Sequence, residues 1–593
     1  MPEALVPARL AFQEGIPYSD AYGDVYHSAA GGLEQAQPVF LKGNSLPGRW
    51  AGRERFVILE TGFGLGLNFL ATWQAWRRDP ARCARLHFVS IEKHPFCLQD
   101  LRTLHELYPQ LKKEAAELHS RWPMLVPGAH RLEFDDGKIV LTLFFADVKV
   151  ARDLRLVADA FYLDGFAPQK NPEMWSPQTM RSLSRLAAPD ATAATWSVAS
   201  SVRSALEEAG FAVEKRPGFG HKRETLVATN VRTDAKGSSP KSRKAVVVGA
   251  GVAGAAVCER LCARGWEVEL YEKHREPAQE ASGNHAGTFH PIATPDDSIF
   301  ARLTRASFLY SLNQFRRFSE LRWDPCGVLQ LARDAKEEAS QRASIAALAL
   351  PPDYAQYVTR EEAAAHAGVP VAGPGLWFPE GGWIQPRSLI EAQLEACGPR
   401  LKRVFGKTLS ALPDVPAVVL ANSYEAPKLQ DVPHLRMRRV RGQVSHVSAP
   451  EIDAPHVVVI RGGMILPPVA GICVVGASYD IDDHDPAPRA ESDAGNIERL
   501  KRILPLAKDI RIVESRVAFR ASTPDRLPVV GKLGAGVYGA FAYGSRGLVW
   551  AALAAELIAS ELEGEPLPLE GKLADAMHPQ RFARRAESRG LRP

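Results

Sequence analysis

The stretch AVVVGAGVAGAAVCERLCARGWEVELYE, residues 245–272, decides the fold of the C-terminal half of the chain. It begins with a short apolar run, continues through a glycine-rich turn into residues of helical character, and ends in a second apolar run. This order predicts a strand at 245–248, a helix at 253–264 and a second strand at 267–272. A strand, helix and strand of this length form the βαβ unit of a parallel sheet.

The glycines of this turn have separate physical tasks. Gly249 allows the tight turn, Gly251 lets the backbone approach a pyrophosphate, and Gly254 allows close packing of helix against strand. The helix N-terminus offers free N–H groups and a positive dipole to the anion. Glu272 ends the second strand, where we expect it to accept hydrogen bonds from a ribose. The unit predicts dinucleotide binding, but the motif alone does not separate FAD from NAD.

Two further stretches favour FAD. One is ASGNHAG, residues 281–287, and the other is FAYGSRGL, residues 541–548, which opens the last long apolar run. Together they supply the residues Ser282, Gly283, Asn284, Gly544 and Gly547. The arrangement resembles the D-amino-acid oxidase and glycine oxidase type of flavoenzyme, in which such stretches close around the FAD. The resemblance implies that these five residues bind the cofactor.

Two arginines are candidates for holding the substrate of such a flavoenzyme. Amine oxidation moves a hydride to the flavin, so the site needs orientation of the substrate more than a strong acid or base. The arginine fork pairs with a carboxylate through two hydrogen bonds. We therefore expect Arg520 and Arg546 to clamp the substrate carboxylate. The alternative for either one is an ordinary surface salt bridge.

A second glycine-rich turn, ETGFGLG at residues 60–66, follows an apolar run near the start of the chain. It carries no lysine, so it is not a phosphate-binding P-loop, and an adenosyl ligand without phosphates fits it better than ATP. The turn resembles that of a class I S-adenosylmethionine-dependent methyltransferase, with NAD binding as the alternative. Apolar runs at 56–60, 86–92, 139–145 and 160–164 predict a mostly parallel sheet with helices on both faces. The residues expected at this cofactor are Glu60, Gly62, Gly64, Gly66, Glu92 and Asp147.

The acceptor side of this second site is expected where the fourth strand ends. There the sequence reads FYLDGFAPQKNPEMW, residues 161–175, which resembles the acceptor loop of amino methyltransferases. A protonated amine has no lone pair with which to attack a methyl sulfonium. Asp164 is therefore the candidate that orients the amine and accepts its proton. The alternative is a turn or a helix cap, which Asp-Gly often forms.

The clearest domain break is TDAKGSSPKSRK, residues 233–244, which is polar and basic and has no apolar periodicity. We expect an α/β protein with a class I Rossmann-like methyltransferase domain at 1–232, a linker at 233–244, and a glycine-oxidase-like FAD-dependent oxidoreductase domain at 245–593. The seven cysteines are scattered without metal-site spacing, which favours a reduced cytoplasmic protein and no metal. No segment reaches the length of a membrane span, so we expect no membrane partner.

Several motifs together resemble one family across nearly the whole chain. Besides the stretches above, they include DVY at 24–26, the run from 39 to 50, FGHKRE at 219–224 and RGQ at 441–443. The family is that of the bacterial bifunctional proteins of tRNA 5-methylaminomethyl-2-thiouridine biosynthesis. The resemblance implies that the FAD domain removes the carboxymethyl group from 5-carboxymethylaminomethyluridine at the tRNA wobble position. The methyltransferase domain then methylates the exposed amine with S-adenosylmethionine.

The sequence departs from the family pattern at Leu65 and His221, neither of which carries an expected chemical group. Lysine and arginine exceed aspartate and glutamate by only 73 to 68, and no RNA-binding motif is present, so the tRNA partner is implied by the resemblance alone. One other reading remains open, an amine oxidase fused to an N-methyltransferase that acts on free small molecules. A non-catalytic N-terminal docking half is disfavoured, because Gly62, Gly64, Glu92 and Asp164 are all present. The sequence leaves the oligomeric state open.

Overall fold

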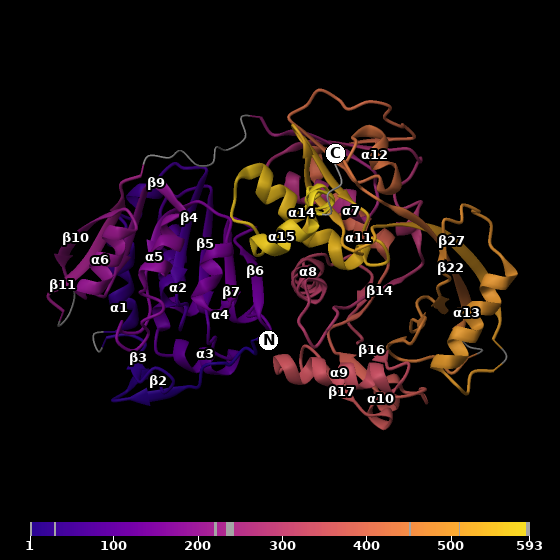
Figure 1. Ribbon diagram of the computed structural model, residues 1–593, viewed down its shortest axis with the longest axis horizontal. Helices are drawn as coiled ribbons and strands as arrows, with labels where there is room; N and C mark the ends of the chain where they lie inside the picture. The colour runs from indigo at the N-terminus through magenta and orange to yellow at the C-terminus, as the bar shows by residue number, and fades with distance from the viewer. Residues whose placement is uncertain are drawn as a thin grey trace. The chain divides into compact units, whose positions relative to one another are not determined.

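The structure is a computed structural model that describes residues 3–28, 31–218, 222–232, 242–449, 452–508 and 510–588. The chain divides into two compact units (Figure 1). The unit that contains Leu5–Ser239 and Leu562–Gly571 is called the methyltransferase unit, after the activity expected from its sequence. The unit that contains Met1–Ala4, Pro240–Glu561 and Lys572–Pro593 is called the FAD unit, after the cofactor expected from its sequence. The segments outside the described residues include 219–221 of the motif at 219–224, 233–241 of the linker, and the last residues, 589–593.

An eight-stranded sheet forms the centre of the methyltransferase unit, in the order β10-β11-β9-β8-β4-β5-β7-β6. The five central strands are parallel, as expected, whereas β11 and the edge strand β6 pair antiparallel with their neighbours. The strand bounds are β4 Arg55–Thr61, β5 Arg85–Glu92, β6 Gly128–Phe134, β7 Ile139–Phe145, β8 Ala158–Tyr162, β9 Ala187–Thr195, β10 Phe211–Pro217 and β11 Glu224–Asn230. The four runs named from the sequence are thus β4, β5, β7 and β8, whereas β6, β9, β10 and β11 were not named.

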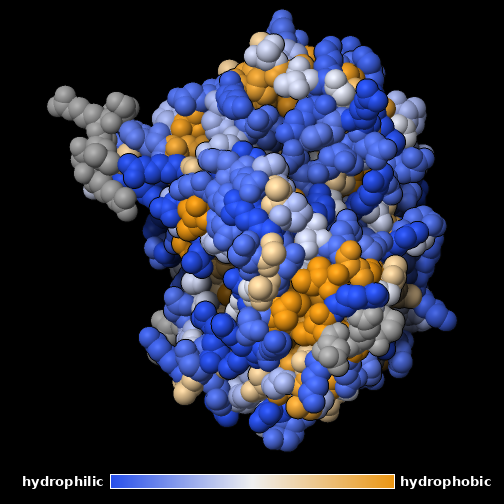
Figure 2. All heavy atoms as spheres, turned by 90° about the vertical axis from the view of Figure 1, so that its right-hand side faces the viewer, coloured by the Kyte–Doolittle hydropathy of each residue, from blue (hydrophilic) through white to orange (hydrophobic). Residues whose placement is uncertain are grey.

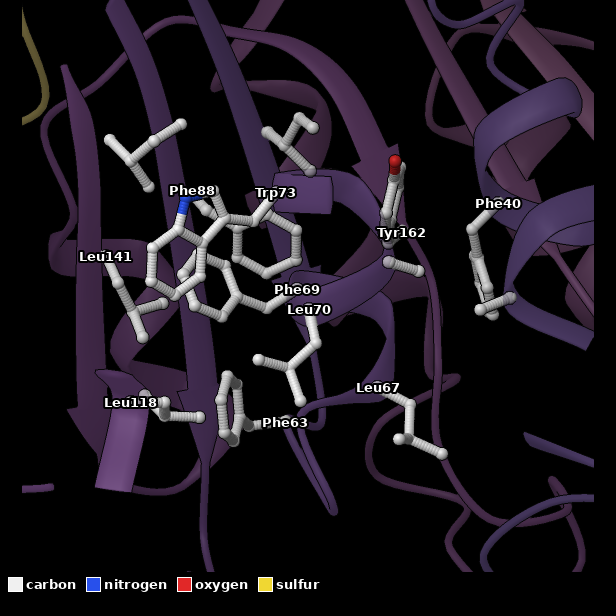
Figure 3. Close-up of a cluster of buried hydrophobic side chains, with 14 of the residues drawn as sticks. Phe40, Phe63, Leu67, Phe69, Leu70, Trp73, Phe88, Leu118, Leu141 and Tyr162 are labelled. Carbon is white, nitrogen blue, oxygen red and sulfur yellow. The ribbon is translucent and has the colours of Figure 1, made fainter. Parts of the chain in front are cut away.

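Helices lie beside this sheet (Figure 1). They are α1 Gly32–Ala36, α2 Leu67–Arg78, α3 Leu98–His105, α4 Lys112–Ser120, α5 Pro177–Ser184 and α6 Ser200–Glu208. The core between sheet and helices is rich in aromatic side chains (Figure 3). Phe69 and Trp73 of α2 pack with Phe88 of β5 and Phe134 of β6, at ring-centroid distances of 4.5–6.1 Å. Each such ring removed from water contributes about 1.5–3 kcal/mol, so α2 is anchored firmly to the strands that carry the site.

A small antiparallel sheet precedes the main sheet of this unit. Its strands are β1 Ala11–Gln13, β2 Ile16–Ser19 and β3 Asp24–Val25, paired in that order. The turn between β2 and β3 closes with the Gly23 N–H donating to the Ser19 carbonyl at 2.8 Å. Gly23 has a φ of +61°, a conformation that glycine adopts without steric cost.

The FAD unit contains the βαβ unit expected from residues 245–272. Its six-stranded sheet has the order β20-β13-β12-β21-β29-β28, and only the β28–β29 pair is antiparallel. Helix α7, Val252–Cys262, joins β12 to β13. The strands are β12 Lys244–Val248, β13 Glu267–Glu272, β20 Leu401–Phe405, β21 Ala417–Leu420, β28 Val529–Gly534 and β29 Val537–Phe541.

The FAD unit also contains a nine-stranded sheet. It contains β16 Val328–Leu331, β17 Gln356–Val358, β18 Gly375–Phe378, β22 Arg438–Ser448, β23 Val458–Ile460, β24 Met464–Ile465, β25 Ile472–Gly476, β26 Asp480–Ile481 and β27 Ile512–Ser522. A three-stranded sheet has β14 Gly287–Phe289, β15 Trp323–Asp324 and β19 Gly382–Ile384. The larger helices are α8 Ile299–Phe315, α9 Ala335–Leu348, α10 Arg360–Ala367, α11 Pro386–Ala396, α13 Ala490–Ile503, α14 Gly547–Glu563, α15 Gly571–Met577 and α16 Arg581–Glu587.

The division into units differs from the expected domains at two places, since Met1–Ala4 belongs to the FAD unit and a segment near the C-terminus belongs to the methyltransferase unit. Residues Leu562–Gly571 follow most of α14 in the chain but belong to the methyltransferase unit. There the Leu567 N–H donates to the Arg155 carbonyl at 3.0 Å, and Arg131 donates to the Pro566 carbonyl at 2.6 Å. Whether 1–232 and 245–593 fold separately stays a prediction.

One face of the molecule is largely hydrophilic, with the largest group of apolar side chains in the lower half of the view and smaller groups at the top and left (Figure 2). In the described part of the chain, none of the helices combines the length and apolarity that crossing a membrane requires.

Candidate active sites

The methyltransferase unit has a cavity of about 410 Å³. Of the residues expected at its cofactor and acceptor, five line this cavity: Gly62, Gly64, Glu92, Asp147 and Asp164. They follow or end β4, β5, β7 and β8, so the cavity lies beyond the carboxyl ends of parallel strands, where open α/β sheets bind their ligands. Glu60 and Gly66 do not line the cavity.

The glycines of the first turn allow its backbone path. Gly62, Gly64 and Gly66 have φ values of +95°, +50° and +73°, in the region that other residues seldom adopt. A Cβ on Gly64 would lie 3.3 Å from the Tyr26 ring, and one on Gly66 would lie 2.6 Å from the Phe63 ring. Gly66 therefore serves packing inside the turn, whereas Gly62 and Gly64 also face the cavity.

A hydrogen-bonded chain of side chains connects Glu60 to Asp164. The Asn68 amide donates to Glu60 Oε1 and to Asp164 Oδ2, each at 2.9 Å. Ser90 donates to the second Glu60 oxygen at 2.6 Å. Burial raises the pKa of Glu60 to about 8 and that of Asp164 to about 6. Glu60 is thus mostly neutral at pH 7, while Asp164 is mostly ionised but more basic than an ordinary carboxylate.

Glu92 and Asp147 occupy the ends of the next two strands. The Glu92 carboxylate accepts from the Gly64 N–H at 2.8 Å and from the His94 N–H at 2.7 Å, which fixes it against the glycine turn. Asp147 accepts from the Lys149 N–H at 3.0 Å and from Lys93 Nζ at 2.9 Å. The backbone and Lys93 hold the pKa of Asp147 below its usual range despite partial burial. Both carboxylates are therefore oriented without any ligand.

The charge of this cavity suits a cation. Its acidic lining residues are Glu92, Asp147, Asp164 and Glu173, and its lysines are Lys93 and Lys170. The sulfonium of S-adenosylmethionine and a protonated alkylamine are both cationic, so the excess of carboxylates favours each of them. The glycine turn, the carboxylate at the second strand end and the charge together fit S-adenosylmethionine.

The FAD unit has a larger cavity of about 850 Å³. The expected residues that line it are Gly249, Gly251, Glu272, Ser282, Asn284, Arg520, Gly544, Arg546 and Gly547. Gly254 and Gly283 do not line it. A Cβ on Gly254 would lie 1.8 Å from the Gly249 carbonyl oxygen, in keeping with its expected role in close packing of helix against strand.

The residues around the second glycine turn form a cradle for a dinucleotide. Gly249 has a φ of +104°, and a Cβ there would lie 2.8 Å from the Ala421 carbonyl oxygen. Glu272 accepts from the Ala250 N–H at 2.8 Å, and Ser282 accepts from the Val252 N–H at 3.1 Å. A side chain at Gly249 would collide with the Ala421 backbone, and the hydrogen bonds of Glu272 and Ser282 fix the turn, so the cradle fits the FAD that the resemblance implies.

Neither candidate clamp residue forms an ion pair with a carboxylate among the described residues. Arg520 donates to the Ser478 carbonyl at 3.4 Å, and Arg546 donates to the His290 carbonyl at 3.2 Å. Burial lowers the pKa of Arg546 to about 10, so the guanidinium is charged at pH 7. Burial and Arg546 lower the pKa of His290 to about 3, which leaves the imidazole neutral. Both arginines line the cavity, and each can therefore donate further hydrogen bonds to a ligand bound in it.

The charge of the larger cavity is opposite to that of the first. Its acidic lining residues are Glu272, Glu280 and Glu425, and its basic ones are Lys273, Lys407, Lys428, Arg439, Arg520 and Arg546. This excess of cations suits the phosphates of a dinucleotide and the carboxylate of a substrate.

The comparisons with known proteins agree with both sites. Residues 244–561 match the family described as FAD dependent oxidoreductase, and residues 109–231 match the family described as S-adenosyl-L-methionine-dependent methyltransferase. The tRNA 5-methylaminomethyl-2-thiouridine biosynthesis bifunctional protein MnmC of Azoarcus sp. (strain BH72) is 47% identical over 624 residues, with 98% of each chain covered. The protein of that name from Paraburkholderia phytofirmans is 46% identical, with 100% of each chain covered.

The chain belongs to this MnmC family. It is a bifunctional enzyme with an S-adenosylmethionine-dependent methyltransferase domain followed by an FAD-dependent oxidoreductase domain, and the expected fold class is confirmed. Among solved structures, glycine oxidase from Bacillus cereus has a TM-score of 0.47 and 17% identity, covering 55% of this chain and 98% of its own. Iminodiacetate oxidase from Chelativorans sp. has a TM-score of 0.47 and 22% identity, covering 55% and 96%.

Two residues near the sites of this MnmC-family chain were missed from the sequence. Asn68 joins Glu60 to Asp164, and its position in the first turn after the glycines was the available signal. Arg516 donates to Asn284 Oδ1 at 2.8 Å and so holds a residue of the FAD cavity, with no signal in the local sequence. Nowhere in the described ranges do three or more His, Cys, Asp and Glu side chains gather as a metal site would need.

Proposed function

We propose that this chain carries out two successive steps of wobble-uridine modification in tRNA. Its FAD unit removes the carboxymethyl group from 5-carboxymethylaminomethyl-(2-thio)uridine, which leaves 5-aminomethyl-(2-thio)uridine. Its methyltransferase unit then converts the amine to 5-methylaminomethyl-(2-thio)uridine. The observation that carries the proposal is the presence of two cavities of opposite charge in a chain whose relatives, similar over their whole length, are named for this biosynthesis.

In the oxidative step the substrate is an N-substituted glycine. FAD held in the cavity lined by Gly249, Gly251 and Glu272 would supply the acceptor for a hydride from the carbon between the amine and the carboxylate. The nitrogen lone pair and the carbon then form an imine, and water cleaves its C=N bond to give the primary amine and glyoxylate. Arg520 and Arg546 are the proposed carboxylate clamp, because both line the cavity and neither pairs with a described carboxylate. The clamp orients the reacting C–H bond.

In the methyl-transfer step the amine must first lose a proton. Asp164 is the proposed acceptor, since it lines the cavity and its raised pKa of about 6 makes it a better base than an ordinary aspartate. The freed lone pair forms the N–CH₃ bond as the S–CH₃ bond of S-adenosylmethionine breaks, which leaves a neutral thioether. Glu92 is the proposed partner of the ribose hydroxyls.

Joining both activities in one polypeptide has a kinetic rationale. The product of the oxidative step is the substrate of methyl transfer, and a shared chain raises its effective concentration at the second site. We also propose that the enzyme binds tRNA largely through phosphate contacts and a flipped-out base, and that it acts in the cytoplasm, where tRNA is modified.

The competing reading, an enzyme of free amines, is tested by comparing two substrates in the oxidative step. One is tRNA that carries 5-carboxymethylaminomethyluridine, and the other is N-methylglycine. The proposal predicts a much higher kcat/KM for the tRNA and a steep loss of that activity with added salt, because phosphate contacts release counterions. Equal or faster oxidation of N-methylglycine, with no salt dependence for the tRNA, would support the free-amine enzyme instead.

A further inference from the structure

One motif singled out in the sequence, Asp24-Val25-Tyr26, has no role in the chemistry described above. The structure places Asp24 at the start of β3, beside the acceptor loop at 164–175. Its Oδ2 accepts from the Ala167 N–H at 2.9 Å, and its Oδ1 lies 3.2 Å from Lys170 Nζ. Lys170 also donates to the Gly23 carbonyl. The Asp24 carboxylate therefore joins the acceptor loop to the hairpin at residues 16–26, which contains β2 and β3. It contacts both the backbone and a side chain of the loop.

The two segments joined in this way, the hairpin and the acceptor loop, carry aromatic rings that line the cavity. Tyr22 and Phe166 stack with a centroid distance of 4.5 Å, and Tyr26 meets Phe166 edge-on at 5.2 Å. Two of these rings come from the hairpin and one from the loop. Their mutual geometry therefore depends on how hairpin and loop are held.

The aromatic wall lies close to both reacting partners. Asp164 is two residues from Phe166, and a Cβ on Gly64 of the cofactor turn would lie 3.3 Å from the Tyr26 ring. A uracil base bearing an aminomethyl group is a planar ring with a cationic arm. Aromatic faces stack on such a ring and also attract an ammonium group.

From this geometry we propose that Asp24 is a positioning residue for methyl transfer. It holds the acceptor loop against the hairpin so that Tyr22, Tyr26 and Phe166 form a stacking wall for the modified uracil. The amine of that base is thereby directed to Asp164. This inference rests on the proposed function, since it assigns the acceptor subsite of the same reaction.

The local structure supports positioning rather than simple stability. Asp24 and Lys170 are partly exposed, with side-chain exposures of 20% and 42%, and an exposed ion pair of this kind adds little to global stability. The loop is also fixed at its far end, where Trp175 donates to the Phe166 carbonyl at 2.9 Å. Loss of Asp24 should therefore change the loop locally and leave the sheet intact.

The test uses the full-length holoenzyme and measures methyl transfer to tRNA that carries 5-aminomethyluridine. Asp24→Ala and Phe166→Leu should each raise KM for this tRNA about tenfold, which corresponds to the lower part of the range for one base stacked on an aromatic side chain. S-adenosylmethionine affinity and the FAD-dependent oxidation should stay within twofold of wild type. Phe166→Tyr, which keeps the ring, should retain a KM close to wild type.

Asp20→Ala is the matched control, because Asp20 is an exposed acid on the same hairpin. It should leave every parameter unchanged. The inference is overturned if Asp24→Ala has the wild-type KM, if Phe166→Leu behaves like Phe166→Tyr, or if Asp24→Ala weakens S-adenosylmethionine binding as much as tRNA. If the wild-type enzyme does not methylate the tRNA at all, the proposed function itself fails.

Discussion

Glu565 offers a sharp test of how the methyltransferase unit is built. The residue lies in Leu562–Gly571, beyond the end of the segment that matches the FAD-dependent oxidoreductase family at residue 561. Its side chain is 3% exposed, and its Oε1 lies 3.5 Å from Arg85 Nε and 3.6 Å from His87 Nε2. Burial lowers the pKa of His87 to about 4, so the histidine is neutral at pH 7 and Arg85 is the cation of the pair.

Replacing this glutamate removes a buried carboxylate that faces the Arg85 cation. Removing one member of a buried pair costs about 3–5 kcal/mol, and we take about 3 because the Arg85 side chain is 14% exposed. For a unit of this size each kcal/mol shifts Tm by about 2–4 °C, so Glu565→Ala should lower the unfolding temperature of the methyltransferase unit by about 6–12 °C.

Scanning calorimetry of the full-length protein measures this shift, and flavin fluorescence reports the FAD unit in the same sample. Glu207→Ala is the control, because the carboxylate of Glu207 pairs with Arg203 at the exposed surface of α6. It should shift Tm by no more than about 2 °C. The reasoning is refuted if Glu565→Ala matches this control, or if flavin release shifts to lower temperature while the methyltransferase transition does not move.

Further substitutions test the two sites separately. Asp164→Asn should abolish methyl transfer while S-adenosylmethionine still binds in calorimetry, and near-normal turnover of this variant would remove Asp164 from catalysis. Methyl transfer by the wild-type enzyme should fall as the pH drops through about 6, because the protonated carboxyl accepts no proton. Glu60→Gln should keep activity within a few-fold at pH 7, since Glu60 is mostly neutral there, and a complete loss would contradict that protonation state. Arg520→Ala and Arg546→Ala should raise KM for the carboxymethyl substrate with the FAD absorbance retained; if both variants oxidise normally, the clamp lies elsewhere.

The sequence was sufficient for features that neighbouring residues encode. The strand, turn and helix around Gly249 and around Gly62 are local patterns, and in both cases the following strand ends in the expected acid. The carboxyl ends of parallel strands meet at one edge of a sheet, so the sequence alone was enough to place Glu92, Asp147 and Asp164 together.

Features formed by distant segments were beyond the same reasoning. Asp24 meets Ala167 across 143 residues of chain, and neither residue has a pattern that names its partner. Leu562–Gly571 reads as the end of an apolar helix and the loop after it, yet it packs in the unit formed by the first half of the chain. Glu60 was expected at the cofactor, whereas in the structure it is buried, bonded to Asn68 and Ser90, and is not among the residues that line the cavity.

The most direct test of the account is nucleoside mass spectrometry of tRNA that carries 5-carboxymethylaminomethyluridine after incubation with this protein. Without S-adenosylmethionine the account predicts accumulation of aminomethyluridine, and with it conversion to methylaminomethyluridine. Unchanged tRNA from a preparation that binds FAD and oxidises free amines would contradict it.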